Sequence, residues 1–523
     1  MLGFVTLPLT LFFLFPSSGA WVPVGPKALL HISNANISPD GIDRPAIVVN
    51  GQHPGPLIRA TKGDTLKIDV FDGLSNEVFF KSTSVPEQHW HGLFQRGQNW
   101  ADGTAFITQC PIARNHSFPY KFVVPHQAGT FWYHSHLSTQ YCDGLRGPLV
   151  IYDPEDPHRH LYDVDDENTV ISLTDWYHTP AIQLPLPPAR FPNSTLINGL
   201  GRYSGGPESD LAVITVQQGK RYRFRLISMS CDANFRFSID DHKMTVIEVD
   251  GVNSQLVEVD LIPIYAAQRY SFVLHANQPV GNYWIRAQPS SGNSTFLGGL
   301  NSAILRYTGA PSVVPTTSPN SAPEQLNEFD LHPWESMPVP GKPYIGGADV
   351  NILLNFTFSR TDNRFLVNNS SFVPPTVPVL LQILSGVRNA HEILPPGSIF
   401  SLPRNVTVEV QMPGGVIGGA HPIHLHGHNF WVVRSAGSNL TNFHDPIVRD
   451  TVSMGDMNDN IAIRFQTNNP GPWFLHCHID FHLNLGFATV FAEDIDGTAA
   501  ANPVPLAWDE LCPIYYSLPA GDL

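Results

Sequence analysis

The chain has 523 residues, which at about 150 residues per domain indicates about three domains. It carries 30 Lys and Arg against 45 Asp and Glu, a formal charge of −15, and only 14% of its residues are charged. The acidic balance argues against a partner such as nucleic acid or an anionic membrane, and 47 prolines exclude a coiled coil. This composition is typical of a loop-rich all-β protein.

The first twenty residues, 1–20, predict a cleaved secretory signal. Phe4 to Phe15 is apolar but too short to span a bilayer, and Ser18 and Ala20 are spaced as at a signal-peptidase site. A buried N-terminal strand is the alternative. Export agrees with a high density of Asn-x-Ser/Thr sequons, which predicts glycosylated surface loops in a secreted, extracellular protein. The sequons begin at Asn36, Asn115, Asn193, Asn293, Asn355, Asn368, Asn369, Asn405 and Asn439.

Short alternating segments recur along the chain and predict β-strands with one buried face. Two stretches rich in proline, Asp153–His160 and Pro311–Gln325, predict linkers that divide the mature chain into three parts. The clearest of the alternating segments are Thr65–Val70, Arg221–Ile227, Asn405–Val410 and Asn460–Phe465.

Each of the three parts contains one copy of a repeated segment. Gly129–His136, Gly281–Gln288 and Gly471–His478 all read glycine, any residue, two aromatic residues, an apolar residue or tyrosine, and a polar–small–polar triplet. In the first and third copies the polar residues are histidines, whereas the middle copy ends Arg286-Ala-Gln288. We therefore expect one β-sandwich repeated three times, with metal chemistry in the outer two.

Four His-x-His pairs are the strongest signal for chemistry. Residues i and i+2 of a strand face the same side, so each pair presents two imidazoles together. Neutral imidazole suits copper, zinc, iron and nickel, and eight imidazoles from the two outer parts predict one metal cluster between them. The pairs are His89 and His91, His134 and His136, His424 and His426, and His476 and His478.

The cysteines distinguish between these metals. Four of the five could pair as disulfides by any of three connectivities, which leaves one over. Cys477 lies between His476 and His478, so its sulfur points to the opposite face. With His421 and His482 nearby and no methionine in the following segment, it predicts a three-ligand blue-copper site.

These motifs resemble those of a known family. His89-Trp-His-Gly, Trp132-Tyr-His-Ser-His, the run from His421 to His428 and the run from His476 to His482 look like the four copper-binding motifs of the blue multicopper oxidases. Framing segments such as Ser138–Gly147 and Pro503–Trp508 resemble the secreted laccases of basidiomycete fungi. The likeness extends over essentially the whole mature chain.

The resemblance implies an all-β fold of three consecutive cupredoxin-like Greek-key β-sandwich domains. The expected divisions are 21–155, with ligands of a trinuclear copper site; 156–325, with no copper ligand but a share of the substrate pocket; and 326–523, with both kinds of ligand. It also implies disulfides Cys110–Cys512 and Cys142–Cys231.

The resemblance further assigns four copper ions per chain. The type 1 copper takes His421, Cys477 and His482, with Phe487 and Ile479 at non-coordinating axial positions. The ligands assigned to the trinuclear cluster are His89 and His424 for type 2, and His91, His134 and His478, with His136, His426 and His476, for the two type 3 ions.

The implied activity is the one-electron oxidation of phenolic and related aromatic molecules, coupled to the four-electron reduction of dioxygen to water. Electrons pass from Cys477 to His476 or His478. Asp102 matches an acid that laccases place near the trinuclear site, and Asp480 follows the last pair; either could relay protons or simply cap a turn.

At the substrate end, His482 is the expected point of electron entry. Asp232 matches the pocket acid that accepts a hydrogen bond from a phenol; the alternative is a solvated loop carboxylate beside a disulfide. Phe365 lines the same pocket or is an ordinary core aromatic residue.

Some residues depart from the family or match no motif. Thr104 stands where many relatives have proline, and Asn484 and Leu485 replace a usual Glu-Ala pair. Five histidines that match no motif are expected at the surface or in structural positions: His116, His126, His242, His391 and His444.

The implied protein is a monomer whose partners are phenolic small molecules and dioxygen, with no nucleic acid or membrane partner. Lignin degradation, pigment synthesis and detoxification of phenols are all open as its role. The alternatives are a ferroxidase, which wants more carboxylates at the type 1 site; an ascorbate oxidase, which wants an axial methionine; a copper electron carrier; and a zinc hydrolase.

Overall fold

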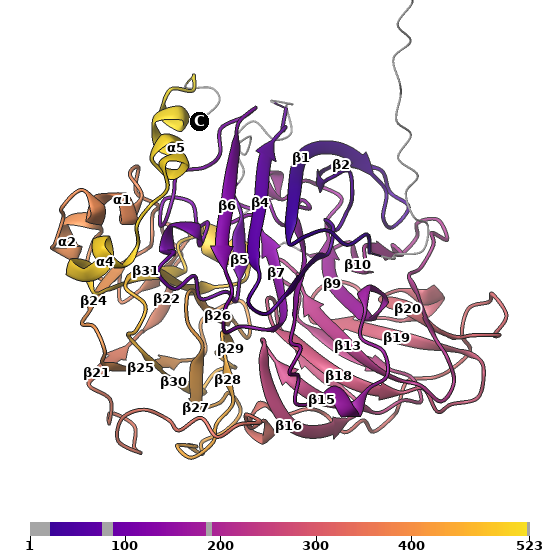
Figure 1. The fold of residues 1–523 in the computed structure, drawn as a ribbon. Helices are drawn as coiled ribbons and strands as arrows, with labels where there is room; N and C mark the ends of the chain where they lie inside the picture. The colour runs from indigo at the N-terminus through magenta and orange to yellow at the C-terminus, as the bar shows by residue number, and fades with distance from the viewer. Residues whose placement is uncertain (1–20, 76–86, 185–190, 520–523) are drawn as a thin grey trace, which may run out of the picture.

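The computed structural model describes residues 21–75, 87–184 and 191–519 (Figure 1). The expected signal peptide, 1–20, lies outside these residues. Across the described ranges no helix is both long enough and apolar enough to cross a membrane.

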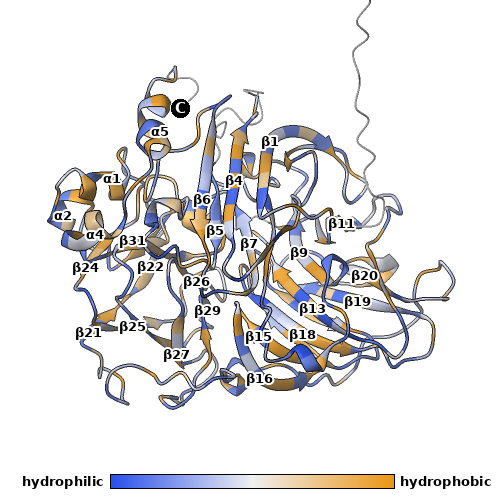
Figure 2. Cartoon of the chain, in the orientation of Figure 1, coloured by the Kyte–Doolittle hydropathy of each residue, from blue (hydrophilic) through white to orange (hydrophobic). Residues whose placement is uncertain are grey.

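The first sandwich, which we call the first domain, is built from eight strands in two four-stranded sheets, β2-β1-β4-β6 and β3-β8-β7-β5. Strand β4 shows why these residues form a sheet with one buried face. Leu66, Ile68 and Val70 are fully buried, while Lys67 and Asp69 between them are exposed. Figure 2 shows the same alternation as a change of colour along the strands. The strands are β1 Lys27–Ile37, β2 Arg44–Val49, β3 Ile58–Thr61, β4 Thr65–Asp72, β5 His89–His91, β6 Ser117–Val123, β7 Gly129–His134 and β8 Arg146–Tyr152.

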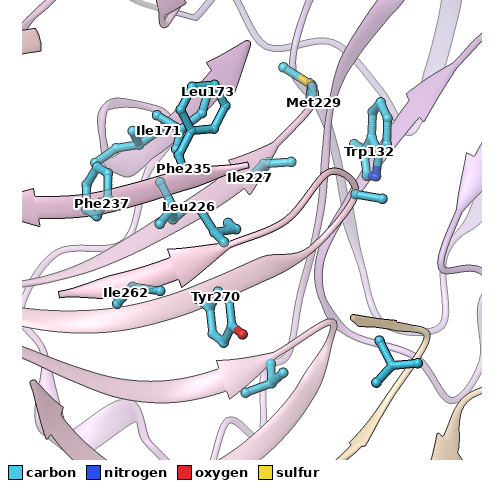
Figure 3. Packing of buried hydrophobic residues seen from close by; sticks show 14 of the residues in the cluster. Trp132, Ile171, Leu173, Leu226, Ile227, Met229, Phe235, Phe237, Ile262 and Tyr270 are labelled. Carbon is cyan, nitrogen blue, oxygen red and sulfur yellow. The ribbon is translucent and has the colours of Figure 1, made fainter. Parts of the chain in front are cut away.

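The second domain pairs a seven-stranded sheet, β11-β10-β9-β13-β18-β15-β16, with a five-stranded one, β12-β20-β19-β14-β17. Its core is aromatic and aliphatic, with Leu226, Phe235 and Phe237 buried between strands of the two sheets (Figure 3). The strands are β9 Val170–Trp176, β10 Ser194–Ile197, β11 Leu200–Gly201, β12 Val213–Val216, β13 Arg221–Ser228, β14 Phe235–Ile239, β15 Met244–Val249, β16 Val252–Val259, β17 Ile262–Ile264, β18 Arg269–His275, β19 Asn282–Pro289 and β20 Ser302–Tyr307.

The third domain has two five-stranded sheets, β21-β25-β30-β27-β28 and β24-β32-β31-β26-β29, and a hairpin of β22 and β23. Its strands are β21 Val350–Leu353, β22 Phe356–Ser359, β23 Arg364–Val367, β24 Ile399–Leu402, β25 Thr407–Pro413, β26 Pro422–Leu425, β27 Phe430–Arg434, β28 Val448–Arg449, β29 Thr451–Ser453, β30 Asn460–Gln466, β31 Gly471–Cys477 and β32 Ala488–Glu493. Its helices are α1 Val379–Leu384, α2 Ala390–Ile393, α3 Asp480–Asn484, α4 Ile495–Ala501 and α5 Leu506–Tyr516.

The three domains repeat one topology. The strands of the repeated sequence segment, β7, β19 and β31, each pair antiparallel with the next strand, β8, β20 or β32. That strand in turn pairs in parallel with β3, β12 or β24. The expectation of three consecutive β-sandwich domains is therefore confirmed.

Of the four predicted strands, only one begins at a different residue from the strand in the structure. Three of them fall within β4, β13 and β30, whereas the strand expected from Asn405 begins at Thr407 as β25. Asn405 has a φ of 55°, in the left-handed region, so the backbone turns there before the strand starts.

The C-terminal helix α5 is docked on the first domain, although it follows the third in sequence (Figure 1). Its residues Trp508, Leu511 and Tyr515 are buried in the first domain's core, and Trp508 Nε1 donates a hydrogen bond to the Thr108 carbonyl at 2.9 Å. A disulfide joins Cys512 of this helix to Cys110, across 402 residues.

Replacing Cys512 with serine should lower the free energy of unfolding by about 2–5 kcal/mol, because a long closed loop restricts the unfolded chain most. Urea denaturation followed by tryptophan fluorescence measures the change, and Cys110→Ser should reproduce it. Equal stability of the variants and the parent would show that α5 is held by its apolar face alone.

Candidate metal centre

The four His-x-His pairs converge between the first and third domains. His89 of β5 lies opposite His134 of β7, and His424 of β26 lies opposite His476 of β31. The imidazoles also meet across the domain boundary, since the rings of His89 and His426 stack with centroids 4.0 Å apart. One pair lies wholly within a strand. In the other three the strand ends at or just after the first histidine, so strand alternation alone does not orient those pairs.

All eight paired histidines are buried, and their nitrogens fit a metal. Five of these nitrogens find no hydrogen-bond partner among the described residues: Nε2 of His89, His134, His424 and His478, and Nδ1 of His91. Burial lowers the pKa of six of the imidazoles well below the ordinary value, which keeps them neutral, the form that binds metals. Unpartnered buried nitrogens are costly unless something occupies them, and copper is the metal that this donor set and the neighbouring thiol suit.

The ligand atoms fall into overlapping groups within 4.8 Å of one another. One group, His136, His426 and His476, coincides with an expected type 3 set, and its Nε2 atoms lie 3.0 and 3.2 Å apart. The other groups of ligand atoms combine histidines from different expected ligand sets. The expected type 2 ligands, His89 and His424, share a group with His426, while His91 and His134 share one with His89. His478 belongs to neither of these groups, but its ring centroid lies 5.0 Å from that of His91 and 5.1 Å from that of His134.

A second group of ligand atoms surrounds the remaining cysteine. Cys477 Sγ lies 3.5 Å from His421 Nδ1 and 3.7 Å from His482 Nδ1, and the two nitrogens are 3.1 Å apart. These spacings suit three atoms bonded to one ion at about 2.0–2.3 Å. Burial raises the pKa of the Cys477 thiol and lowers that of His421 to about 4. Metal binding would therefore displace a proton from the sulfur but none from the His421 imidazole.

Different elements position the three side chains. His421 directly precedes β26, Cys477 ends β31, and His482 lies on the short helix α3, which the alternating sequence pattern did not predict. Gly418 packs against both imidazoles: a Cβ there would lie 2.8 Å from His482 Cε1 and 3.1 Å from His421 Cε1. Its φ of +111° also favours glycine.

Apolar side chains close the other sides of this group. The ring of Phe487 lies 5.0 Å from that of His421, and the backbone N–H of Cys477 donates to the Phe487 carbonyl at 3.1 Å. Ile479 is also buried. Neither residue offers a ligand atom. Leu485 acts through its backbone, since its carbonyl accepts a hydrogen bond from Phe365 N at 2.9 Å.

A cavity of about 350 Å³ opens beside His482. Phe365, Ile479 and Phe481 line it, and Asp232 is the one carboxylate among its described lining residues. Phe365 is both a pocket wall and a core residue: it is buried, and its ring centroid lies 4.7 Å from that of His482.

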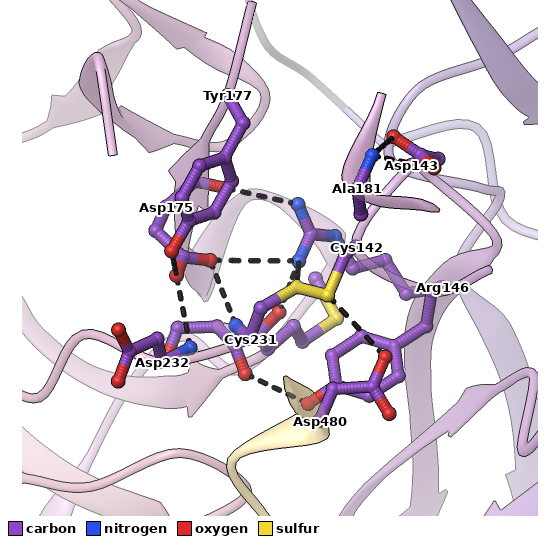
Figure 4. Close-up of a disulfide and its surroundings, with 12 residues drawn as sticks. Cys142, Asp143, Arg146, Asp175, Tyr177, Ala181, Cys231, Asp232 and Asp480 are labelled. Atoms are coloured by element: carbon purple, nitrogen blue, oxygen red, sulfur yellow. Dashed lines mark hydrogen bonds and ion pairs between the residues drawn. A yellow bond between two sulfur atoms is a disulfide. The ribbon is translucent and has the colours of Figure 1, made fainter. Parts of the chain in front are cut away.

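A buried carboxylate holds the turn that carries Asp232 (Figure 4). Asp175 accepts hydrogen bonds from the backbone nitrogens of Cys231 at 2.7 Å, Asp232 at 2.9 Å and Ala233 at 3.3 Å. The turn is tied to the first domain by the disulfide between Cys231 and Cys142.

Asp480 lies on the other side of this disulfide. Its backbone N–H donates to the Cys231 carbonyl at 2.9 Å, and its Oδ2 lies 3.3 Å from Cys142 Sγ (Figure 4). The carboxylate is buried at the junction of all three domains.

Asp102 touches the histidine cluster directly. Its Oδ2 lies 2.9 Å from His426 Nδ1, and its backbone carbonyl lies 2.7 Å from His89 Nδ1. The hydroxyl of Thr104 donates to the same Oδ2 at 2.8 Å. A proline at position 104 has no hydroxyl and could not make this contact.

Sequence reasoning missed Asp450, which lies beside two ligand histidines. Its Oδ1 lies 3.2 Å from His91 Nε2, and its backbone carbonyl lies 2.9 Å from His424 Nδ1. It stands in no motif, and only the fold brings it here. The five histidines expected at the surface or in structural positions lie outside both groups: His242 is buried against Tyr307, and His116, His126, His391 and His444 are exposed.

Comparison with known proteins agrees with this geometry. Three stretches, 31–156, 167–310 and 372–497, each match the multicopper oxidase family. The chain is 60% identical over 505 residues to the laccase of Pycnoporus cinnabarinus, with 96% of each chain covered. It is 61% identical to laccase-2 of Trametes versicolor, with 95% of each covered.

Solved structures show the same architecture. The laccase of Botrytis aclada superposes with a TM-score of 0.80 at 30% identity, over 95% of this chain and 93% of that one. Fet3p, a multicopper oxidase that functions in iron import, superposes with a TM-score of 0.82 at 28% identity, over 94% and 95%.

The fold, the two ligand groups and these matches define a copper-dependent oxidoreductase built from three cupredoxin-like domains. The chain belongs to the multicopper oxidase family, in its laccase branch.

Proposed function

We propose that this protein is a laccase that oxidises phenolic and related aromatic molecules and reduces dioxygen to water. One observation carries the proposal: a buried thiol lies 3.5 and 3.7 Å from two imidazole nitrogens, and both of its sequence neighbours are histidines of the other cluster. The three-residue segment His476-Cys477-His478 therefore joins the two ligand groups covalently.

The ligand sets follow the family. His421, Cys477 and His482 would hold the type 1 copper, and the eight paired histidines would hold one type 2 and two type 3 ions, four in all. When bound, copper supplies one-electron acceptance at the first site and four-electron reduction of dioxygen at the second. Cys477, His476 and His478 are the catalytic residues that connect them.

The substrate pocket is built for an aromatic molecule that loses a proton with its electron. Phe365 and Phe481 provide apolar walls, and His482 also lines the cavity. Asp232 would accept the hydrogen bond, and then the proton, of a phenolic hydroxyl. Phe487 and Ile479, which are both buried, would keep water from the Cys477 sulfur.

Dioxygen reduction consumes protons, and Asp102 would deliver them. Its Oδ2 receives one hydrogen bond from Thr104 and lies against His426 Nδ1. Asp480, at the junction of the three domains, is a second candidate in the same role.

Secretion, glycosylation and a monomeric state complete the proposal. Seven of the nine sequon asparagines are exposed and the other two are partly exposed. Two disulfides agree with an oxidising compartment.

Oxidation of ferrous iron is the second candidate, favoured by the likeness to Fet3p. A site for a cation would be expected to present several carboxylates, whereas Asp232 is the one acid among the described residues of the pocket. The identity of 60% to laccases against 28% to Fet3p also favours the phenolic substrate.

Optical and spin-resonance spectra of the copper-loaded protein, with copper counted per chain, test the proposal. A thiolate absorption band, type 1 and type 2 resonances, about four coppers and oxygen uptake with a phenol are expected. Absence of the thiolate band after copper loading would contradict the assignment of Cys477. Faster turnover of ferrous iron than of a phenol would show that the protein is a ferroxidase and not a laccase.

Replacing Asp232 with asparagine should raise KM for a phenol about tenfold, since a hydrogen bond to a charged acceptor contributes about 1.5–3 kcal/mol. An electron donor without an ionisable hydroxyl should be oxidised as before. Steady-state kinetics with both donors measure this, with the exposed Asp241→Asn as the control for loss of charge. A parallel loss with both donors would place Asp232 outside phenol recognition.

A further inference from the structure

A buried ion pair joins the second domain to the histidine cluster of the other two. Arg269, the first residue of β18, donates from both terminal guanidinium nitrogens to the two carboxylate oxygens of Asp450, each at 2.7 Å. The side chains of Arg269 and Asp450 are 0% and 1% exposed. Such a bidentate pair fixes the plane of the carboxylate as well as its position.

The carboxylate that Arg269 holds faces ligand histidines from both outer domains. Asp450 Oδ1 lies 3.2 Å from His91 Nε2 of the first domain. The backbone carbonyl of Asp450 lies 2.9 Å from His424 Nδ1 of the third domain, and its Oδ1 also accepts from Thr451 Oγ1 at 2.8 Å. The other nitrogen of each ring, His91 Nδ1 or His424 Nε2, has no hydrogen-bond partner within the part of the chain that the structure describes. Asp450 therefore determines which nitrogen each ring turns toward the cluster.

The glycine of the first His-x-His motif lies against this ion pair. A Cβ on Gly92, the residue after His91, would lie 2.6 Å from Arg269 Nη2 and 2.9 Å from Asp450 Oδ2. The glycine of His89-Trp-His-Gly92 thus leaves room for the ion pair at the back of the ligand strand.

Arg269 is itself anchored at several points. Its Nε donates to the Thr130 carbonyl of β7 at 3.0 Å, and its backbone N–H donates to Asp250 at 2.7 Å. Asp250 also accepts from Arg449 Nε at 2.9 Å. The guanidinium contacts the strand of the first domain that carries His134 and the residue of the third domain that orients His424.

We propose that Arg269 is a positioning residue of the second domain, which sets the orientation of His91 and His424 through Asp450 and so determines how firmly the type 2 copper is held. The inference rests on the proposed function. The second domain is then more than a spacer between two copper-binding units: it supplies a guanidinium to their shared centre.

Copper retention in two matched variants tests the proposal. Arg269→Lys keeps the charge and loses the bidentate geometry. Arg286→Lys makes the same change in the same domain, because Arg286 binds Asp240 through two bonds of 2.7 Å and contacts none of the cluster histidines. The copper-loaded proteins are challenged with a chelator, and the type 2 resonance and the thiolate absorption are followed with time.

Arg269→Lys should lose the type 2 resonance about 10- to 100-fold faster than the parent, the usual effect of removing a partner of a metal ligand, with the thiolate band retained. Arg286→Lys should match the parent. Asp450→Asn, which keeps the side-chain shape, should also lose type 2 copper faster, and it carries the test if Arg269→Lys does not fold.

Equal retention in Arg269→Lys, Asp450→Asn and the parent would overturn the inference and leave the pair as an interdomain contact only. So would simultaneous loss of the thiolate band and the type 2 resonance, because a general loosening of the fold would then explain the result. A parent protein without any type 2 resonance would instead contradict the proposed function.

Discussion

Replacing Cys477 with serine will remove the thiolate absorption band, reduce the copper content by one per chain and lower phenol oxidation by at least about a thousandfold. The reason is that Sγ lies in one group with the nitrogens of His421 and His482, the proposed type 1 site, and in the covalent segment that links this group to the cluster. Residues that act as one unit lose most of the activity when any one of them is removed.

The same variant contains its own control. The eight paired histidines remain, so the type 2 resonance should persist, and anaerobic addition of a small reductant should still reduce the cluster. A Cys477→Ser protein that keeps a strong visible band, or that oxidises phenols within tenfold of the parent, would contradict the site assignment.

Replacing Asp102 with asparagine should lower turnover about 100-fold while substrate still reduces the type 1 site at the parental rate. An amide keeps the size of the side chain but cannot carry a proton from Thr104 Oγ1 toward His426, whose Nδ1 lies 2.9 Å from Asp102 Oδ2. Anaerobic bleaching of the blue band measures the first step, and oxygen uptake measures the second.

The matched control is Asp72→Asn, a buried carboxylate of the first domain that caps the Leu74 N–H and touches none of the cluster histidines. It should leave turnover unchanged. Slower bleaching in Asp102→Asn would assign this residue to the electron path or to the stability of the type 1 site, and not to proton delivery.

Much of the fold could be predicted because its signals are local. Alternation in segments such as Thr65–Val70 reports a half-buried strand directly, and the segments beginning at Gly129, Gly281 and Gly471 reveal three copies of one unit. The short helices were not predicted, because α3 spans only Asp480–Asn484 and a single turn has no periodicity to detect. Its position is set by the domain around it.

The candidate site likewise contains residues that the sequence reveals and residues that only the tertiary structure reveals. The histidine pairs and Cys477 are visible because ligands of one type recur at fixed spacing. Arg269 and Asp450 are 181 residues apart and stand in no motif, so only tertiary structure shows that they meet behind His91. Asp175, which shapes the Asp232 turn through backbone bonds, is hidden for the same reason.

The wide separation of the cluster histidines in the chain has a consequence for biosynthesis. His136 and His476, whose Nε2 atoms lie 3.2 Å apart, are 340 residues apart in sequence. At about 5–20 residues per second, the ribosome needs roughly 20–70 s to add the second after the first. During that interval the nascent first domain carries four histidines without their partners. Copper capture is thereby a late event that reports completed assembly, so a chain halted before its last domain cannot acquire a working oxygen-reducing centre.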